Sequence, residues 1–209
     1  MNNTSLRFLD GLDQKTVEER KNALRSYMKE RRGNNENRDV KERLLIENFY
    51  RTIFGDSMGA GTRLNVFVYL SFSSEAPTDG LIERLRLDGH NVYCPRIEKG
   101  EMQAVLYGED FTLSSYGIRE PIGEIYEGNI DVAVLPLLAV DKQGHRLGYG
   151  KGYYDRYLRL RPKMKRIAYA FDFQVLDSVP CSDLDESADM IVTDKRIIAC
   201  DCKRKILGE

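Results

Sequence analysis

The chain has 209 residues, of which 42% are hydrophobic and 10% aromatic, and this is enough for the core of one domain or of two closely joined domains. Its 32 basic and 33 acidic residues give a net charge of −1 at pH 7, so any attraction to phosphate has to be local and we expect no nucleic-acid partner. The longest uncharged run, residues 64–74, is far too short to cross a bilayer, and the charged amino terminus does not resemble a signal peptide, so we expect no membrane partner.

The cysteine and histidine spacing indicates neither a zinc site nor a disulfide framework. The four cysteines are Cys94, Cys181, Cys200 and Cys202. They form no Cys-x-x-Cys pair, and neither His90 nor His145 is spaced to complete a metal site with them. A reducing, cytoplasmic location is the simplest expectation.

Two helices are expected first. Residues 1–14 are interpreted as a flexible lead-in, and residues 15–209 as a single domain. Thr16 and Glu19 form a capping box, which predicts a helix from residue 16 to about 32 that ends at Gly33-Asn-Asn. On this helix Lys21, Arg25 and Lys29 are four residues apart and share one face, separate from an apolar stripe.

A second helix, over about residues 37–54, is expected to bury four apolar side chains. These are Val40, Leu44, Phe49 and Ile53.

From residue 64 onward, short apolar runs alternate with helical segments. The expected strands cover residues 64–70, 91–94, 102–107, 130–135 and 166–170, with edge strands over 190–193 and 196–200; the expected helices cover residues 78–87, capped by Thr78, and 153–160. This order predicts an α/β fold with a mostly parallel central sheet and helices on both faces.

Ligands of such sheets bind beyond the carboxyl ends of the strands. This rule brings together the loop after Leu70, which holds Glu75, and the loop after the strand at 130–135.

That second loop contains three alternating glycines. Gly148, Gly150 and Gly152 are interleaved with Lys151 and follow Arg146. Glycines allow backbone N–H groups to approach a phosphate closely, and the two cations would neutralise it. The loop matches neither a Walker A motif, which needs Ser or Thr after the Gly-Lys pair, nor a dinucleotide fingerprint. The simpler alternative is a tight turn in which the glycines only supply positive φ angles.

The segment Arg146-Leu-Gly-Tyr-Gly-Lys-Gly-Tyr-Tyr-Asp-Arg-Tyr157, preceded by Val140-Asp-Lys-Gln-Gly144, closely resembles the signature of the 5-formyltetrahydrofolate cyclo-ligases, also called methenyltetrahydrofolate synthetases. Other segments match in order: Lys21-x-x-x-Arg25, Tyr69-Leu-Ser-Phe-Ser-Ser-Glu75 with Thr78, Pro95-Arg-Ile97, Gly117-Ile-Arg-Glu-Pro121, and Val179-Pro180 leading to Asp185. The resemblance covers about residues 21–193. It implies a Rossmann-like fold and the conversion of 5-formyltetrahydrofolate, with ATP and Mg²⁺, to 5,10-methenyltetrahydrofolate, ADP and phosphate in one-carbon metabolism.

The resemblance also implies roles for individual residues. The expected ATP-binding residues are Lys21, Arg25, Arg146, Leu147, Gly148, Tyr149, Gly150, Lys151, Gly152, Tyr153 and Tyr154. Among these, Lys151, Arg146 and Tyr153 are expected to be catalytic, and Asp155 and Asp185 are expected to bind Mg²⁺ through their carboxylates. The alternative for Asp185 is an exposed loop charge, and for Lys21 and Lys151 a solvated surface lysine.

The expected folate-binding residues are Leu70, Glu75, Tyr149, Gly150, Lys151, Gly152 and Tyr153. The pterin edge offers two parallel N–H donors, which one carboxylate can accept together, and this favours Glu75. Tyr153 and Tyr154 could stack on the flat ring, as could Phe72, although we favour buried packing for Phe72. Tyr149 stands where some members of the family carry Arg, so this position contributes either charge or shape.

Two other classes of function remain open. A non-catalytic relative could keep the fold and only bind folate or nucleotide, but it would not need both aspartates. An RNA-binding protein is disfavoured by the near-neutral charge and by the absence of interleaved aromatic and basic residues.

Overall fold

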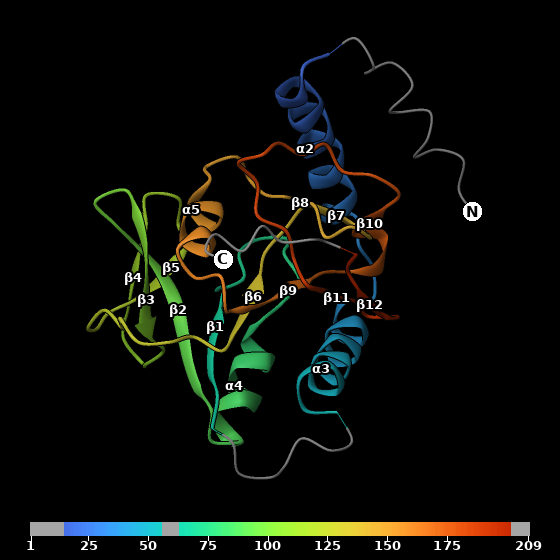
Figure 1. Ribbon diagram of the computed structural model, residues 1–209. Helices are drawn as coiled ribbons and strands as arrows, with labels where there is room; N and C mark the ends of the chain where they lie inside the picture. Colours follow the sequence, from blue (N-terminus) through green and yellow to red (C-terminus); the bar gives the residue numbers. More distant parts are fainter. Residues whose placement is uncertain (1–14, 56–62, 202–209) are drawn as a thin grey trace.

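The computed structural model describes residues 15–55 and 63–201, and a seven-stranded sheet lies at its centre (Figure 1). The strand order is β12-β11-β9-β6-β1-β2-β3. The strands of this sheet are β1 (Asn65–Val68), β2 (Asn91–Glu98), β3 (Glu101–Leu106), β6 (Val132–Leu135), β9 (Lys165–Tyr169), β11 (Met190–Val192) and β12 (Ile197–Ala199). The five inner strands run parallel, and the edge strands β3 and β12 are antiparallel to their neighbours. The predicted mostly parallel α/β fold is confirmed.

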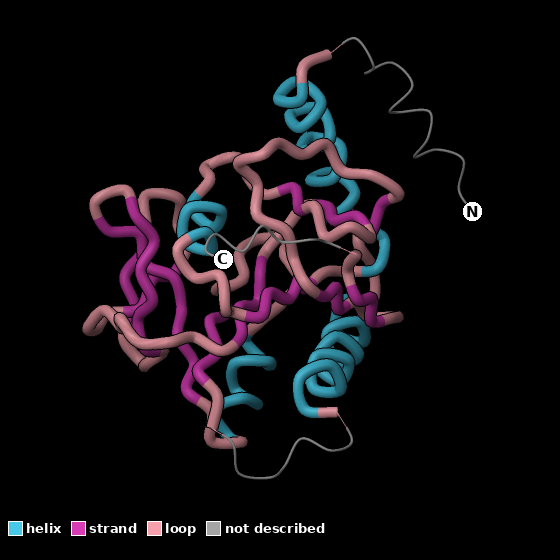
Figure 2. The backbone as a smooth tube through the Cα atoms, viewed as in Figure 1, coloured by secondary structure: helices cyan, strands magenta, loops and turns pink. Residues whose placement is uncertain are grey.

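The direction in which the chain crosses the sheet reverses between β1 and β6. The chain first moves from β1 to β2 and β3, and it then returns to the other side of β1 to add β6, β9 and β11. The connections after β1 and β6 therefore diverge at the carboxyl ends of these two neighbouring strands, and ligands of open α/β sheets bind at such a point. Loops collect there, close to the first helix (Figure 2).

Helices cover both faces of the sheet. Residues of β1 alternate: Val66 and Val68 face α3 (Arg38–Phe54) and α4 (Asp79–Leu87), whereas Phe67 packs with residues of α5 (Tyr153–Arg159) on the other face. The central strands β1, β6 and β9 are almost entirely buried for this reason, and the sheet provides a rigid base for the loops.

The first helix, α2 (Val17–Gly33), packs against a small second sheet instead of the main one (Figure 1). That sheet has the order β10-β7-β8, with β7 (Ala139–Asp141), β8 (Arg146–Leu147) and β10 (Val175–Leu176), the last preceded by a 3-10 turn at Asp172–Gln174. Leu24 and Met28 pack against Ala139 and Leu147, which places α2 directly beside the glycine-rich loop that follows β8. The predicted capping box is present, since the Thr16 and Glu19 side chains bond each other's backbone N–H.

Several predicted details are wrong. Val40 and Leu44 of α3 are 48% and 39% exposed, because the buried stripe runs through Leu45, Phe49 and Ile53, which are four residues apart and share one side of the helix. 

Thr78 is the N-cap residue of α4, as predicted, but its side chain makes no capping hydrogen bond, because its hydroxyl donates to the Tyr69 carbonyl and accepts from the Ser71 N–H. The strand at Met190–Val192 is not an edge, since β12 pairs beyond it.

Other elements were not predicted from the sequence. The hairpin of β4 (Phe111–Leu113) and β5 (Arg119–Pro121) is one, and the small β10-β7-β8 sheet is another. The lead-in expected at residues 1–14 lies outside the described residues, and the single domain over residues 15–209 stays a prediction. Among the described residues, no helix combines the length and apolar character needed to span a membrane.

Candidate active site

The sequence-predicted site residues come from four segments; one of them, between β10 and β11, carries Asp185, and the other three meet beyond the carboxyl ends of β1 and β6. The loop after β1 carries Glu75, the loop after β8 carries the three glycines, and α2 carries Lys21 and Arg25. Because β1 and β6 are paired, their following loops are neighbours although about 70 residues separate them. The sequence-based expectation that these loops lie together is confirmed.

The loop after β8 that contains Gly148, Gly150 and Gly152, called the glycine loop below, needs glycine for its backbone angles and for the close approach of Arg25. Gly150 and Gly152 have φ angles of 94° and 66°, which strain any other residue. A β-carbon on Gly150 would lie 3.1 Å from the Arg25 guanidinium carbon, so a side chain at residue 150 would push Arg25 away from the loop. The positive φ angles that the tight-turn alternative requires are therefore present at Gly150 and Gly152, and the close contact with Arg25 is an additional feature of the loop.

Two basic residues of α2 contact the site. The Arg25 Nε donates to the Gly148 carbonyl at 3.1 Å. Lys21 is only 6% exposed, and its ammonium lies 2.5 Å from the Asp185 carboxylate. The alternative of a solvated surface lysine is thus wrong for Lys21. Lys29, the third residue on this face, is exposed and lies over the Tyr149 ring.

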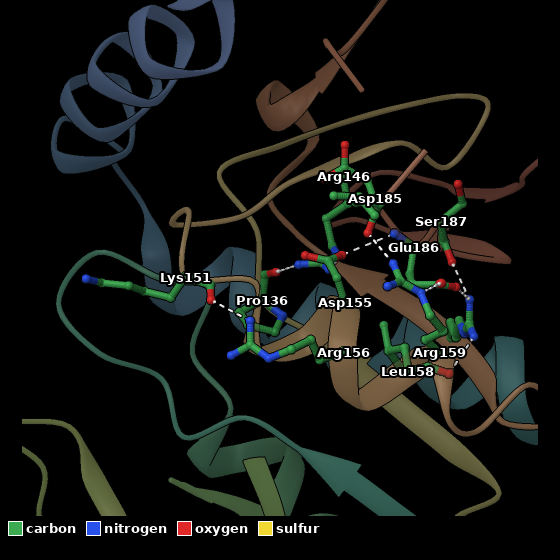
Figure 3. Close-up of polar contacts among 12 residues, drawn as sticks. Pro136, Arg146, Lys151, Asp155, Arg156, Leu158, Arg159, Asp185, Glu186 and Ser187 are labelled. Carbon is green, nitrogen blue, oxygen red and sulfur yellow. Dashed lines mark hydrogen bonds and ion pairs between the residues drawn. The ribbon is translucent and has the colours of Figure 1, made fainter. Parts of the chain in front are cut away.

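Arg146 and Asp155 form a second ion pair, drawn in Figure 3. The Arg146 Nη2 donates to Asp155 Oδ1 at 2.8 Å, and the same oxygen accepts the Glu186 N–H at 3.1 Å. Since Glu186 directly follows Asp185, this backbone bond brings the segment of one aspartate beside the other. The buried Arg146 Nε has no hydrogen-bond partner among the described residues.

The candidate metal ligands are thus both neutralised by a cation. Burial raises the pKa of Asp185, but the hydrogen bonds from Lys21 and Ser182 outweigh it and hold the pKa below its ordinary value. Within residues 15–55 and 63–201, no cluster of three or more His, Cys, Asp or Glu side chains forms a self-sufficient metal site. Mg²⁺ commonly uses one or two carboxylates and completes its shell with phosphate oxygens and water, so the two aspartates fit it only together with a phosphate ligand.

Lys151 differs from the other site cations because it is exposed. Its side chain extends away from the Arg146–Asp155 pair (Figure 3), and its ammonium lies 5.7 Å from the centre of the Tyr116 ring, in the β4–β5 turn. Its carbonyl accepts a bond from Arg156, which fixes the backbone at the start of α5. Within the described residues the Lys151 ammonium makes no ion pair, so it is available to an anionic ligand.

Glu75 lies buried in the loop after β1. Its Oε2 accepts the Phe72 N–H at 2.9 Å, and the Tyr149 hydroxyl is a second donor to its carboxylate. Burial raises the pKa of Glu75 above its ordinary value, while these two hydrogen bonds and the charge of Arg32 act in the opposite direction. Glu75 is therefore a desolvated acceptor with few competing partners, which suits recognition of a neutral ligand edge with paired N–H donors.

The remaining predicted residues divide into core and surface. Leu70 is 3% exposed and belongs to the core beneath the loop. Tyr154 packs against the core that contains Val66 and Val68 and against the core that contains Phe67. Its pKa lies well above the ordinary value because of burial and nearby Glu75. Tyr153 lies at the start of α5 beneath the Arg156 guanidinium. The buried packing favoured for Phe72 is wrong, since 46% of this residue is exposed and its ring lies against the β4–β5 turn.

Sequence reasoning missed three residues of this region. Arg32 contacts Tyr149 and the loop that carries Glu75; Arg38 donates to the Ser74 and Glu75 carbonyls; and Tyr116 lies against Lys151. Arg32 and Arg38 flank the end of α2 and the start of α3, where charged residues are usually solvated, so the sequence carried no signal for them. Tyr116 could have been found from the Ser-Tyr-Gly turn before β5, where a large aromatic residue is unusual.

Comparison with known proteins agrees with this geometry. The family model of the 5-formyltetrahydrofolate cyclo-ligases matches residues 17–194. The chain is 31% identical over 143 residues to the 5-formyltetrahydrofolate cyclo-ligase of Escherichia coli K12, and this match covers 63% of this chain and 79% of that protein. It is 29% identical over 196 residues to the 5-formyltetrahydrofolate cyclo-ligase of Mus musculus, and this match covers 85% of this chain and 95% of that protein.

A solved structure of the Aquifex aeolicus 5,10-methenyltetrahydrofolate synthetase superposes with a TM-score of 0.74 at 25% identity, covering 90% of this chain and 97% of that one. A structure of the corresponding Mycoplasma pneumoniae protein, at 23% identity and a TM-score of 0.66, has the same fold. The fold, the order of the motifs and these relatives together lead to one conclusion: the chain belongs to the 5-formyltetrahydrofolate cyclo-ligase family of enzymes.

Proposed function

We propose that this enzyme uses ATP and Mg²⁺ to convert 5-formyltetrahydrofolate to 5,10-methenyltetrahydrofolate, releasing ADP and phosphate. One observation carries the proposal: the buried carboxylate of Glu75, which forms no ion pair within the part of the chain that the structure describes, lies at the same end of the sheet as two carboxylate–cation pairs and the glycine loop. The first feature suits a pterin, and the others suit a metal-bound triphosphate.

We assign the triphosphate to the space between α2 and the glycine loop. Lys21 and Arg25 would approach it from the helix, while Arg146 and Lys151 would approach it from the loop. The unpartnered Arg146 Nε supports this assignment, because a buried donor without an acceptor is costly unless a ligand supplies one. Lys151 is the best candidate for contact with the transferring phosphoryl group because it makes no ion pair among the described residues.

The two aspartates would bind Mg²⁺ only after an exchange of partners. Phosphate oxygens would take over Lys21 and Arg146, and the Asp185 and Asp155 carboxylates would become available to the metal. When bound, Mg²⁺ supplies Lewis-acid stabilisation of charge on the phosphate oxygens. In the free protein, Lys21 and Arg146 hold these carboxylates in place and prevent their mutual repulsion.

In the folate slot, Glu75 would accept the pterin N–H donors and so turn the N5-formyl group toward the γ-phosphate. The formyl oxygen would attack the γ-phosphorus and release ADP. The N10 nitrogen would then attack the formyl carbon and lose its proton to a phosphate oxygen, and the C–O bond to the phosphorylated oxygen would break to release phosphate. The protein contributes alignment of the reactants and compensation of the phosphate charge.

The test is a direct assay of the purified protein with Mg-ATP and 5-formyltetrahydrofolate. We expect the absorbance of the methenyl product to appear together with one equivalent of phosphate, and both to require ATP and Mg²⁺. Tight binding of both ligands without product would favour the alternative of a sequestering protein. Product formation without ATP would contradict the proposed mechanism. The cytoplasmic location stays a prediction from the cysteine pattern.

A further inference from the structure

Arg32 is a buried arginine at the carboxyl end of α2, and it bonds three different segments. Its Nε donates to the Ser74 hydroxyl at 3.0 Å, its Nη1 donates to the Leu137 carbonyl at 3.1 Å, and its Nη2 donates to the Tyr149 hydroxyl. The residue is 3% exposed. Burying a guanidinium costs free energy unless its donors are satisfied, so Arg32 can be buried only because these three acceptors are in place.

The direction of the hydrogen bonds follows from chemistry. A guanidinium can only donate, so the Tyr149 oxygen accepts from Arg32 and its own proton is left to donate elsewhere. The other partner of the Tyr149 hydroxyl is the Glu75 carboxylate. The chain Arg32 to Tyr149 to Glu75 is therefore oriented, and each bond strengthens the next because Arg32 polarises the hydroxyl.

Five titratable or charged groups from the surrounding elements interact with Glu75. The groups are Arg32 from α2, Arg38 from the start of α3, Tyr69 after β1, Tyr149 from the glycine loop and Tyr154 from α5. Arg38 bonds only the Glu75 backbone. The Arg32 charge and the Tyr149 hydrogen bond are thus the side-chain contributions that favour the ionised carboxylate.

We propose that Arg32 and Tyr149 are positioning residues for folate: Arg32 fixes the Tyr149 hydroxyl, and this hydroxyl fixes the Glu75 carboxylate in the orientation that accepts the pterin. The inference rests on the proposed function, which assigns Glu75 to the pterin. It explains why a buried arginine outside the glycine loop contacts a tyrosine inside it.

The proposal has a consequence for pH. Glu75 has to be ionised to accept two donors, and its ionised fraction falls as the pH falls through its pKa. Removing Tyr149 or Arg32 takes away a group that lowers this pKa, so the pKa of Glu75 rises further. The acid limb of kcat/KM for folate then moves to higher pH, whereas a merely structural role would lower activity at every pH alike.

The experiment is a double-mutant cycle of Arg32→Gln and Tyr149→Phe in the full-length protein. Each single variant should raise the folate KM roughly tenfold, leave the ATP KM within about twofold, and shift the acid limb upward. If Arg32 acts through Tyr149, the double variant should be about as impaired as either single variant. The proposal would be overturned if the change in folate KM of the double variant equalled the product of the two single changes, or if the acid limb did not move.

Two further variants keep the result interpretable. Arg31→Gln is the matched control, because Arg31 lies over the rings of Tyr27 and Phe173 and contacts neither Tyr149 nor Glu75; its folate KM and pH profile should stay unchanged. Thermal unfolding of all variants separates loss of the Ser74 and Leu137 contacts from loss of positioning. Glu75→Gln tests the underlying assignment of Glu75 to the pterin, which is wrong if this variant uses folate normally. If Glu75→Gln loses folate use selectively but Arg32→Gln and Tyr149→Phe behave like the wild type, only the role of Arg32 and Tyr149 is overturned.

Discussion

The Lys21 ammonium lies 2.5 Å from the Asp185 carboxylate, although 164 residues separate the two in the chain. Asp185 also accepts the N–H and hydroxyl of Ser182, so its loop is fixed against α2 at this one carboxylate. The side chains are 8% and 20% exposed, and water therefore weakens the pair only in part. The contact joins a candidate phosphate-binding residue to a candidate magnesium ligand before either ligand is present.

Lys21→Met tests this coupling. The variant should bind Mn²⁺, used as a probe for Mg²⁺, more tightly than the wild type when no nucleotide is present, because the Asp185 carboxylate is no longer neutralised. Its ATP affinity should fall roughly tenfold, since one charge-assisted bond to phosphate is lost. Calorimetric titration with Mn²⁺ alone and with ATP alone measures both effects. A lower affinity for Mn²⁺ would show that Lys21 supports the metal site in some other way.

The pH dependence of stability should contain a contribution from Asp185. Its folded-state pKa lies below the ordinary value of 3.8, so the stability it provides is present above pH 3.8 and is lost as the pH falls through the folded pKa. Asp185→Asn should lower the free energy of unfolding at pH 7 by about 1–3 kcal/mol, because Lys21 is left buried and unpaired. The difference should shrink below about pH 3.8 in urea unfolding curves recorded without metal or nucleotide. A difference that stays constant down to pH 2.5 would contradict this assignment.

Lys151→Ala should abolish most turnover without affecting folding. The side chain is exposed, and among residues 15–55 and 63–201 it contacts the Tyr116 ring and forms no ion pair, so its loss costs little stability. Removing a preorganised charge from a phosphoryl-transfer site costs roughly 2.7–4 kcal/mol, about a hundredfold or more in kcat. Exposed Lys163, in the turn before β9, provides the matched control as Lys163→Ala. Near-normal turnover in Lys151→Ala would contradict the catalytic role of Lys151 and favour the interpretation of the glycine loop as a tight turn.

Glu75→Gln should impair folate use selectively. The amide places an NH₂ group where the second carboxylate oxygen was, so one pterin donor faces another donor. Losing this charge-assisted bond costs about 1.5–3 kcal/mol, or roughly ten- to a hundredfold in kcat/KM for folate. ATP affinity should stay within about twofold, and Glu83→Gln on the exposed side of α4 should change neither quantity. Equal loss for both ligands would show that Glu75 supports the structure of the site and does not bind the pterin.

Local sequence was sufficient wherever a short-range rule governs the structure. The capping box of Thr16 and Glu19, the alternation of apolar runs with helices, and the glycines at 150 and 152 all depend on neighbours within a few residues. The rule for strand ends then placed Glu75 and the glycine loop at one end of the sheet. The positions of these elements, and the family of the chain, could be read from the sequence alone.

The partners of the charged side chains depended on the tertiary structure. Lys21 and Arg32 lie on the same helix as the exposed Lys29 and the half-buried Arg31, and their spacing alone does not show which of them are buried. Packing of Leu24 and Met28 on the small sheet turns α2 so that Lys21 meets Asp185 and Arg32 meets Tyr149. The sequence determined which residue types reach the site, whereas the docking of α2 decided which of them are buried, because burial of a charge depends on partners that are distant along the chain.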